Sequence, residues 1–301
     1  MRRTRFPDPK GGNSILWGDY RIEGAGGENE TEELTMDDSA IRLDREPELH
    51  APSLYAAWPG MGNVSLNAAK YLVEKLEMEP IGSIESTESS VAEGIAIRDH
   101  LVLPLEAPEY RFYAFKHPDG GGDLLLFVAD HQPLQPQAVA LGRLVMRVAK
   151  RFAVRRVYTS AALMCSISHM ERPRVWGVAT HRELLPELEE SGVRLLPEGH
   201  VSGLNGLLLG VGQRMGVEGL CFLGELPYYT IGMDNPKSSL AVLERLCRLW
   251  KIRLDTSDLR EASLKKEIEI EEFIRQGEKS IPSDAWEDEG EGKGADTQQY
   301  N

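Results

Sequence analysis

The hydrophobic positions of this chain alternate between short continuous runs and helical repeats. The first pair is the apolar run Ser53–Trp58, closed by Pro59 and Gly60, and the segment Asn63–Leu76, where apolar residues recur every three to four positions. A short apolar run bounded by Pro and Gly predicts a buried strand, and the later repeat predicts a helix capped by its Asn. Strand, glycine turn and helix in this order are typical of the opening of an α/β domain.

The same alternation continues to Gln276. Further strands are predicted, in chain order, at Ile81–Glu85, Gly94–Leu103, Arg111–Lys116, Leu124–Ala129, Val154–Ser160, Arg174–Ala179, Val193–Leu196 and Leu220–Leu223. Further helices are predicted at Gln135–Phe152, Arg182–Glu190, Ser202–Met215, Pro236–Trp250 and Leu259–Gln276, with Asn235 and Ser257 as caps of the last two. The glycine-rich segment Pro118–Gly122 joins two strands as a hairpin loop, so we expect part of the sheet to be antiparallel.

Acidic residues concentrate at the two ends of the chain. The 301 residues carry 34 Lys and Arg against 48 Asp and Glu, a formal net charge of −14. Residues 1–50 hold 12 acidic and 7 basic side chains, and residues 261–301 hold 12 and 5, so the stretch between them is nearly neutral. We therefore expect a partly disordered N-terminal arm (1–50), an α/β domain (51–258), an amphipathic helix (259–279) and a disordered acidic tail (280–301).

Composition and charge exclude several classes of protein. With 41% hydrophobic and 27% charged residues, the chain is typical of a soluble globular protein. Its acidity argues against nucleic-acid binding, because phosphate contacts need clustered Lys and Arg. No apolar run approaches the ~18 residues of a membrane span, and no apolar segment follows the basic start, so we expect a cytoplasmic protein and no membrane partner.

Cysteine and histidine usage predicts neither disulfides nor a metal site. Cys165, Cys221 and Cys247 each lie in an apolar run without C-x-x-C spacing, so we expect buried free thiols. The seven His residues show no metal-ligand spacing. We expect no bound metal and no cofactor.

The first candidate for a ligand site is the loop containing Gly60, Gly62 and Asn63, where the first strand meets a helix N-terminus. Glycines there let backbone N–H groups approach a ligand, and the helix dipole favours an anion. The same residues also suit a tight strand–helix turn that binds nothing. We prefer the turn and keep the anion site as the alternative.

Two further candidates follow predicted strands, where open α/β sheets bind ligands. Asp130, beside His131, is an acid–base candidate, and its alternative role is to turn the chain through hydrogen bonds to the backbone. His169 lies near Cys165, a possible nucleophile, although no G-x-S-x-G elbow is present in the sequence. A buried cysteine and a loop histidine explain this segment as well, and we prefer the structural interpretation for both candidates.

Glu225 is the third candidate at the carboxyl end of a predicted strand, and Tyr228 and Tyr229 are close to it in sequence. It could act as a base, as a ligand for a cation or as an anchor in an interface. Tyrosine is enriched at protein interfaces, because it buries a large area at a low cost in entropy. We therefore prefer a structural or contact role for Glu225.

Three segments resemble motifs of one known family. They are Ser53–Val64 (SLYAAWPGMGNV), Glu198–Leu208 (EGHVSGLNGLL) and Gly219–Pro227 (GLCFLGELP). They are similar to the strand–PGxGNV–helix, SGLNG and GExP segments of the proteasome assembly chaperone 2 family, over roughly Leu54–Leu259. The motif residues are Gly203, Asn205, Gly206, Gly224, Glu225 and Pro227.

The resemblance implies a three-layer α/β/α domain with a mixed sheet, of the phosphorylase/hydrolase-like type. It also implies a homo-oligomer, with a trimer as one form consistent with the family, and a proteasome-like core particle as a partner. Proteasome regulators, including some relatives in this family, dock through a mobile tail with a penultimate Tyr. Tyr300 and Asn301 end this chain in that way, although Gln299 stands where a hydrophobic residue is usual.

Two functional hypotheses result. The first is a non-enzymatic oligomeric protein that binds other proteins as an assembly chaperone or as an adaptor of a proteasome core. The alternative is an enzyme of phosphorylase/hydrolase-like or ATP-dependent carboligase type, acting on a small anionic or nucleotide-like ligand. The narrow apolar stripe of the Leu259–Gln276 helix suits packing on a neighbouring subunit or on its own domain, and the pattern does not separate the two.

Overall fold

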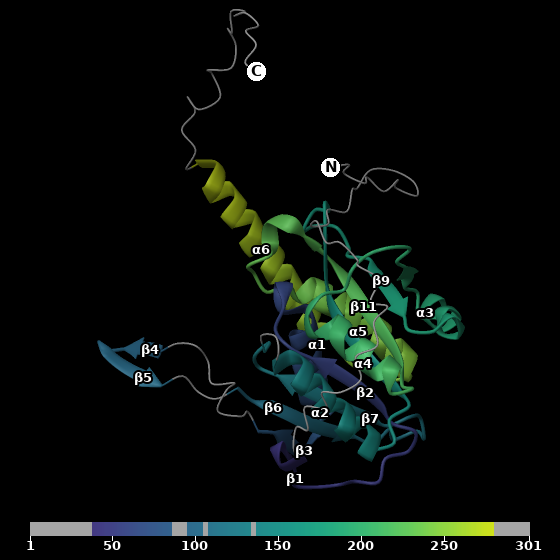
Figure 1. The fold of residues 1–301 in the computed structure, drawn as a ribbon. Helices are drawn as coiled ribbons and strands as arrows, with labels where there is room; N and C mark the ends of the chain where they lie inside the picture. Colours follow the sequence, from purple (N-terminus) through teal and green to yellow (C-terminus); the bar gives the residue numbers. More distant parts are fainter. Residues whose placement is uncertain (1–37, 86–94, 105–107, 134–136, 280–301) are drawn as a thin grey trace, which may run out of the picture.

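One mixed sheet runs through the protein, in the strand order β1-β3-β6-β7-β2-β8-β11-β9-β10 (Figure 1). The computed structural model describes residues 38–85, 95–104, 108–133 and 137–279. The strands of this sheet are β1 (Ile41–Leu43), β2 (Ser53–Ala57), β3 (Glu79–Ile84), β6 (Tyr110–Phe115), β7 (Leu124–Ala129), β8 (Arg156–Cys165), β9 (Val175–Ala179), β10 (Arg194–Leu195) and β11 (Glu218–Pro227). The α-helices are α1 (Val64–Lys75), α2 (Gln137–Arg151), α3 (Leu185–Glu190), α4 (Gly203–Arg214), α5 (Pro236–Trp250) and α6 (Ser257–Lys279).

Four parallel strands form the centre of the sheet. β7 pairs with β2, β2 with β8, and β8 with β11, all in parallel, so their carboxyl ends meet at one border of the sheet, which we call the carboxyl edge. Towards the borders, β6 runs antiparallel to β7, β3 to β6 and β9 to β11, whereas β10 pairs with β9 in parallel. The predicted hairpin across Pro118–Gly122 is confirmed by the pairing of β6 with β7.

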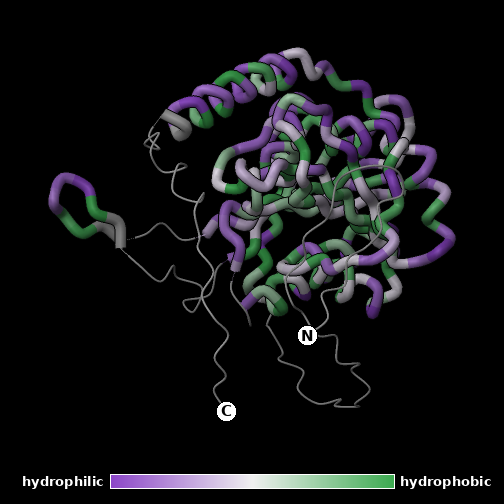
Figure 2. Tube along the Cα trace, turned by 90° about the horizontal axis from the view of Figure 1, so that it is seen from above, coloured by the Kyte–Doolittle hydropathy of each residue, from purple (hydrophilic) through white to green (hydrophobic). Residues whose placement is uncertain are grey.

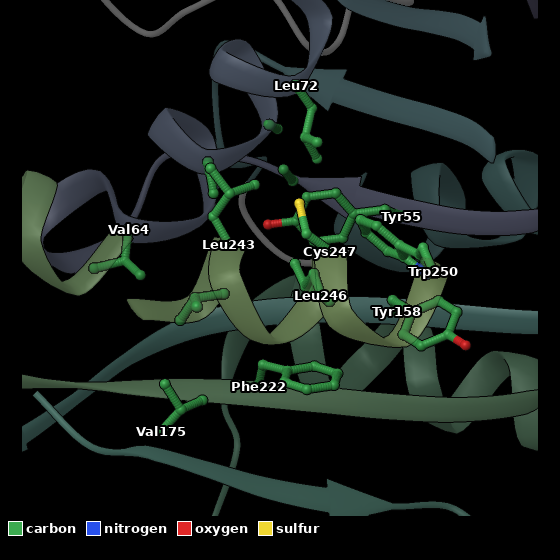
Figure 3. Close-up of a cluster of buried hydrophobic side chains, with 14 of the residues drawn as sticks. Tyr55, Val64, Leu72, Tyr158, Val175, Phe222, Leu243, Leu246, Cys247 and Trp250 are labelled. Carbon is green, nitrogen blue, oxygen red and sulfur yellow. The ribbon is translucent and has the colours of Figure 1, made fainter. Parts of the chain in front are cut away.

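Helices cover both faces of the sheet, which confirms the expected three-layer α/β/α fold. α1, α3 and α5 pack on one face and α2 and α4 on the other, each over its own hydrophobic cluster. Figure 3 shows how strand and helix side chains meet in the first cluster, where Trp250 of α5 lies against Tyr55 of β2 and Tyr158 of β8. The ring centroids are 5.6 and 5.4 Å apart, within the range of favourable aromatic contact.

The predicted single strand Gly94–Leu103 is wrong. Within it, β4 (Ile95–Arg98) and β5 (Leu101–Pro104) form a separate antiparallel pair. Asp99 and His100, which join them, both have positive φ, at 51° and 67°. A two-residue loop with two such residues matches the twist of paired strands, and Asp tolerates this conformation better than most residues. This turn was not predicted because it contains neither Gly nor Pro.

Two central strands are longer than the hydrophobic runs predicted. β8 extends from the expected Ser160 to Cys165, and β11 continues through Gly224 and Glu225 to Pro227. β11 is hydrogen-bonded on both sides, to β8 and to β9, so its backbone stays extended where the apolar run stops. Cys165 is therefore the last residue of a strand and not part of the following loop.

Helix ends differ from the expected caps in two of three cases. Asn235 accepts a hydrogen bond from the Ser238 backbone N–H at 2.8 Å and caps α5, as predicted. Asn63 stands at the start of α1 without capping it through its side chain. Ser257 is the first residue of α6 and not its cap, and this helix continues to Lys279.

Several expectations on the ends of the chain lie outside the described residues. These are most of the predicted N-terminal arm, the acidic tail 280–301, and Tyr300 and Asn301 within it. The last part of the predicted N-terminal segment 1–50 carries β1, which pairs with β3 and so belongs to the sheet. Among the helices that the structure describes, none is long and apolar enough to cross a membrane. The three cysteines are buried and free, as expected.

Candidate functional site

The loop with Gly60, Gly62 and Asn63 is fastened to a second loop at the carboxyl edge. Gly62 has a φ of 62°, and a Cβ on it would lie 2.9 Å from Leu226 and 3.1 Å from Asn235. Its carbonyl accepts a hydrogen bond from the Asn235 N–H at 2.9 Å. The Asn63 side chain donates to Asp234 Oδ1 at 2.6 Å, which explains why it does not cap α1. These contacts support the interpretation of a tight turn, and its partner loop could not be identified from sequence.

Asp130 connects two neighbouring strands. Its Oδ1 accepts hydrogen bonds from the Glu109 N–H at 2.8 Å and from His131 Nδ1 at 2.9 Å, and its own N–H donates to the Glu109 carbonyl. Two strands, β2 and β8, separate β7 from β11. At about 4.8 Å per strand, Asp130 is roughly 14 Å from the residues that follow β11. Asp130 and Glu225 are therefore not parts of one catalytic group.

Glu225 is buried, with 2% of its surface exposed, and its carboxylate is fully engaged. Oε2 accepts hydrogen bonds from the Arg174 backbone N–H at 2.9 Å and from Arg174 Nε at 3.1 Å, and Oε1 accepts one from Trp176 Nε1 at 3.0 Å. A buried carboxylate needs such donors, because burial without them is costly. Its bonds fasten the start of β9 to β11, which supports a structural role for this motif residue.

His169 lies in a loop that α6 covers. Its backbone N–H donates to the Tyr229 hydroxyl oxygen at 2.8 Å, and its Nδ1 is 2.9 Å from the same oxygen. On its other side, Nε2 is 3.0 Å from Glu271 Oε2 of α6. Lys237 Nζ donates to the carbonyls of His169 and Met170, both at 2.9 Å, and pairs with Glu267 of α6. Glu267 of α6 thus pairs with Lys237 across the carboxyl edge, and Glu271 lies beside the His169 ring.

The proposed nucleophile near His169 is not activated. Burial raises the pKa of the Cys165 thiol to about 12, and the nearby Glu225 carboxylate acts in the same direction. Because the thiolate is the nucleophile, a thiol with this pKa is almost wholly unreactive near neutral pH. The cavity between the His169 loop and α6 is about 10 Å³, room for a single water molecule. Neither observation supports a substrate site at His169.

The remaining motif residues pack elements together. A Cβ on Gly206 would lie 2.0 Å from the Val201 carbonyl oxygen, so only glycine fits at this point of α4. Gly203 begins the same helix, and Asn205 is buried in its first turn. Gly224 lies against Ser238 of α5, on the opposite face of β11 from Glu225. Pro227, at the end of β11, offers its carbonyl to the Thr230 hydroxyl.

A group of exposed apolar side chains remains at the carboxyl edge. The loops there expose Met170, Tyr228, Tyr229 and Ile231, and α6 exposes Leu264 and Ile268, which we together call the edge patch. The Tyr228 and Tyr229 rings are 5.4 Å apart and Tyr229 contacts His169, so part of the patch is held in place by the residues just described. Figure 2 shows α6 on the outside of the body, with hydrophobic turns between hydrophilic ones. Clustered Tyr and Met side chains are typical of protein interfaces.

No metal-binding arrangement accompanies the edge patch. In the parts of the chain that the structure describes, no group of three or more His, Cys, Asp or Glu side chains could hold a metal ion. The fold and this edge thus define the class: a three-layer α/β/α protein whose candidate polar residues are each bonded to separate partners, with exposed apolar side chains at the carboxyl edge.

Comparison with known proteins identifies the family. The PAC2 family model matches residues 54–274, so this chain belongs to the PAC2 family. The resemblance in the three sequence motifs is thereby confirmed. The chain is 26% identical over 239 residues to an uncharacterised protein of Methanocaldococcus jannaschii, MJ1210, a match that covers 77% of this chain and 85% of the other.

Solved structures share the fold. Pyrococcus furiosus PbaB, described as an archaeal proteasome activator, is 24% identical with a TM-score of 0.67, and the match covers 79% of this chain and 98% of PbaB. Pyrococcus furiosus PbaA, described as an archaeal homolog of proteasome-assembly chaperone, is 23% identical with a TM-score of 0.61, covering 80% and 94%. Rv2125 of Mycobacterium tuberculosis, a proteasome-assembly chaperone homologue, is 21% identical with a TM-score of 0.62, covering 74% and 95%.

Proposed function

We propose that this chain is a non-enzymatic protein that associates with copies of itself and binds other proteins, as an assembly chaperone or as an adaptor of a proteasome-like core particle. The observation that carries the proposal is the edge patch. It occupies the carboxyl edge, where an enzyme of this architecture would bind its substrate. Its apolar side chains are exposed, whereas the Glu225 carboxylate and the Lys237 ammonium nearby are bonded within the protein.

The separation of the three catalytic candidates supports this proposal over an enzyme. Asp130 bonds to Glu109, Glu225 to Arg174 and Trp176, and His169 to Tyr229. Catalysis needs a nucleophile or acid–base pair within hydrogen-bond reach of one reacting atom. Asp130 follows β7, His169 lies in the loop after β8 and Glu225 lies in β11, each with its own partners, so together they do not offer this.

Family membership indicates the kind of partner. PbaB, PbaA and Rv2125 are each described in relation to the proteasome, as an activator or as assembly-chaperone homologues. A proteasome-like core particle, or its unassembled subunits, is therefore the partner that we propose for the edge patch. Tyr300 and Asn301, which resemble the Tyr-containing docking segment of proteasome regulators, are a second contact in the same proposal.

Capture of a purified proteasome core particle on the immobilised chain tests the proposal. The double variant Leu264→Glu/Ile268→Glu places two charges in the edge patch and should weaken capture tenfold or more, because an apolar contact would have to bury them. Glu261→Ala, on an exposed position of the same helix, is the matched control and should bind like the natural chain.

A second comparison separates the tail from the edge patch. Deleting Gln299–Asn301 should weaken capture if the tail docks, and unchanged capture would remove it from the proposal. If the edge-patch variant also bound as tightly as the natural chain, the proposed partner surface would be wrong.

A further inference from the structure

The two-stranded pair β4–β5, residues 95–104, carries exposed apolar side chains on both of its faces. We call it the arm. Ile97 and Val102 stand opposite each other on one face and are 72% and 65% exposed. Leu101 pairs with Arg98 on the other face and is 66% exposed. Figures 1 and 2 both show the arm standing away from the body.

Such an arm is poorly stabilised in water by itself. An isolated two-stranded hairpin is at best marginally stable, and independent stability needs a third strand or a packed face. Among the described residues, β4 and β5 pair only with each other. Burial of a large aliphatic side chain is stabilising, and the arm leaves three such side chains exposed. A surface that covers the arm is therefore to be expected.

The protein has a surface of suitable size and character near the root of the arm. β3 ends at Ile84 and β6 begins at Tyr110, next to the end of β7, so the chain leaves for the arm and returns from it at the carboxyl edge. A hollow lies beside this point, between α1 and strands β6 and β7. It is lined by Lys70, Val73, Glu74, Glu109, Arg111, Tyr113, Val128 and Asp130.

The volume of the hollow suits side chains better than a metabolite. It holds about 260 Å³ and opens to solvent. Pockets for small ligands usually hold roughly 300–1,000 Å³, whereas removing one large side chain from a core leaves about 150 Å³. One or two aliphatic side chains would fill the hollow.

We propose that the arm of one copy of this chain docks in the hollow of another copy. Val73, Tyr113 and Val128 offer an apolar floor to the aliphatic side chains of the arm. The rim carries both signs of charge, and so does the tip of the arm, with Arg98 and Asp99. Charges of both signs on both surfaces allow opposite charges to meet and fix the register.

The position of the two surfaces favours exchange between copies. Arm root and hollow lie at the same edge of the sheet, so two copies facing each other can each insert an arm into the other, in one self-complementary interface. This inference deepens the proposed function, because it names the surface of the self-association and rests on that self-association.

A disulfide between copies tests the contact directly. Val102→Cys and Lys70→Cys are made in separate chains, mixed and mildly oxidised, and run on a non-reducing gel. The native thiols Cys165, Cys221 and Cys247 are buried and should not interfere. Docking between copies predicts a covalent dimer in this mixture. A mixture of Val102→Cys with Glu261→Cys, which lies on exposed α6, is the control and should form little.

Two outcomes of the gel experiment would overturn the inference. One is a dimer no more abundant than in the control mixture. The other is a disulfide that forms only within one chain, in the double variant Val102→Cys/Lys70→Cys at high dilution, because the arm would then cover its own body.

Light scattering with size-exclusion chromatography distinguishes failure of this inference from failure of the proposed function. The natural chain should assemble, and Ile97→Glu/Val102→Glu should raise the dissociation constant of assembly tenfold or more. The control Glu261→Ala, at an exposed position outside the arm, the hollow and the edge patch, should leave this constant unchanged. A natural chain that stays monomeric at every concentration would overturn self-association and the arm contact together. If Ile97→Glu/Val102→Glu assembled with an unchanged dissociation constant, the arm contact alone would be overturned.

Discussion

Single residues at the carboxyl edge take their conformation from partners far away in the sequence. Glu225 is bonded to Arg174, 51 positions earlier, and Asn63 to Asp234, 171 positions later. Each residue also looked like a possible ligand or catalytic group on its own. Their bonds account for both without a ligand, because a buried or half-buried polar group is stable once it has donors and acceptors around it.

The glycines of α4 give the first residue-scale prediction. Gly206→Ala should lower the free energy of unfolding by roughly 1–3 kcal/mol, because its Cβ would collide with the Val201 carbonyl. Gly210→Ala in the same helix meets nothing within 4 Å and should raise stability, by up to about 1 kcal/mol, since Ala favours helices over Gly. Urea denaturation measures both, and equal effects of the two substitutions would contradict the packing role of Gly206.

The buried thiols give a prediction on pH dependence. Burial raises the pKa of Cys165, Cys221 and Cys247 to about 12, so the folded chain keeps protons that the unfolded chain releases above its thiol pKa of 9.0. Their contribution to stability is therefore complete below about pH 9 and is lost as the pH rises towards 12. Fully buried Cys221 alone contributes a slope on the order of 1 kcal/mol per pH unit.

Denaturation curves under reducing conditions on either side of about pH 9 measure this loss, and a thiol reagent provides the control. At about pH 8 no thiol should react in the folded protein, and all three should react after unfolding in urea. A thiol that reacts rapidly in the folded protein would contradict the assigned burial and would revive the nucleophile hypothesis.

At the scale of elements, α6 shows what an amphipathic pattern leaves undecided. Its apolar stripe was expected to face either its own domain or a neighbouring subunit. In the structure, some apolar residues of α6 pack on the domain and others are exposed to solvent. Ile270 is buried and Leu259 packs into the core with α5, whereas Leu264 and Ile268 are exposed. One helix thus closes the domain and contributes to the edge patch.

The ion pair between Lys237 and Glu267 should be the main polar attachment of α6. Both side chains are largely buried, so Glu267→Ala should cost roughly 1–3 kcal/mol and increase hydrogen exchange along α6. Glu261→Ala removes an exposed pair with Lys265 on the same helix and should cost about 0.5 kcal/mol or less. Urea denaturation compares the two variants. If Glu267→Ala cost no more than Glu261→Ala, the helix would be held by its apolar contacts alone.

At the scale of the whole molecule, the carboxyl edge carries two different surfaces. The hollow lies beside β6 and β7, where the chain also leaves for the arm and returns from it, and the edge patch lies beyond β8 and β11. Strand β2 lies between these two pairs of strands, so the proposed contacts with a copy of the chain and with another protein can form at the same time. This arrangement fits a protein that brings other proteins together.

Ligand screening tests the enzyme alternative for the whole molecule. A ligand that binds only the folded state at 100 times its dissociation constant stabilises it by about 2.7 kcal/mol. We expect ATP, ADP and inorganic phosphate at millimolar concentration to leave the melting temperature unchanged, because the Gly60–Asn63 loop is packed against Asp234 and Asn235. A reproducible rise with a nucleotide would favour the alternative. A Gly60→Ala variant, whose Cβ would meet nothing nearby, would then show whether this loop binds it.

Much of the fold could be predicted because the signals are local. The repeat in Val64–Lys75, the Asn-Pro start of α5 and the Gly-rich loop before β7 each depend on residues within one element. The family motifs also predicted the three layers. The turn at Asp99 and His100 was not predicted, because positive φ values do not change the hydrophobic pattern.

The sequence by itself thus determined the order of the elements, the mixed sheet and the family, because periodicity and motifs are properties of neighbouring residues. Only the tertiary structure decided which polar residues are satisfied and which apolar ones are exposed. That Glu225 is enclosed by Arg174 and Trp176, and that α6 leaves Leu264 uncovered, depends on contacts between segments distant in the chain. Such contacts follow from packing, which no local pattern encodes.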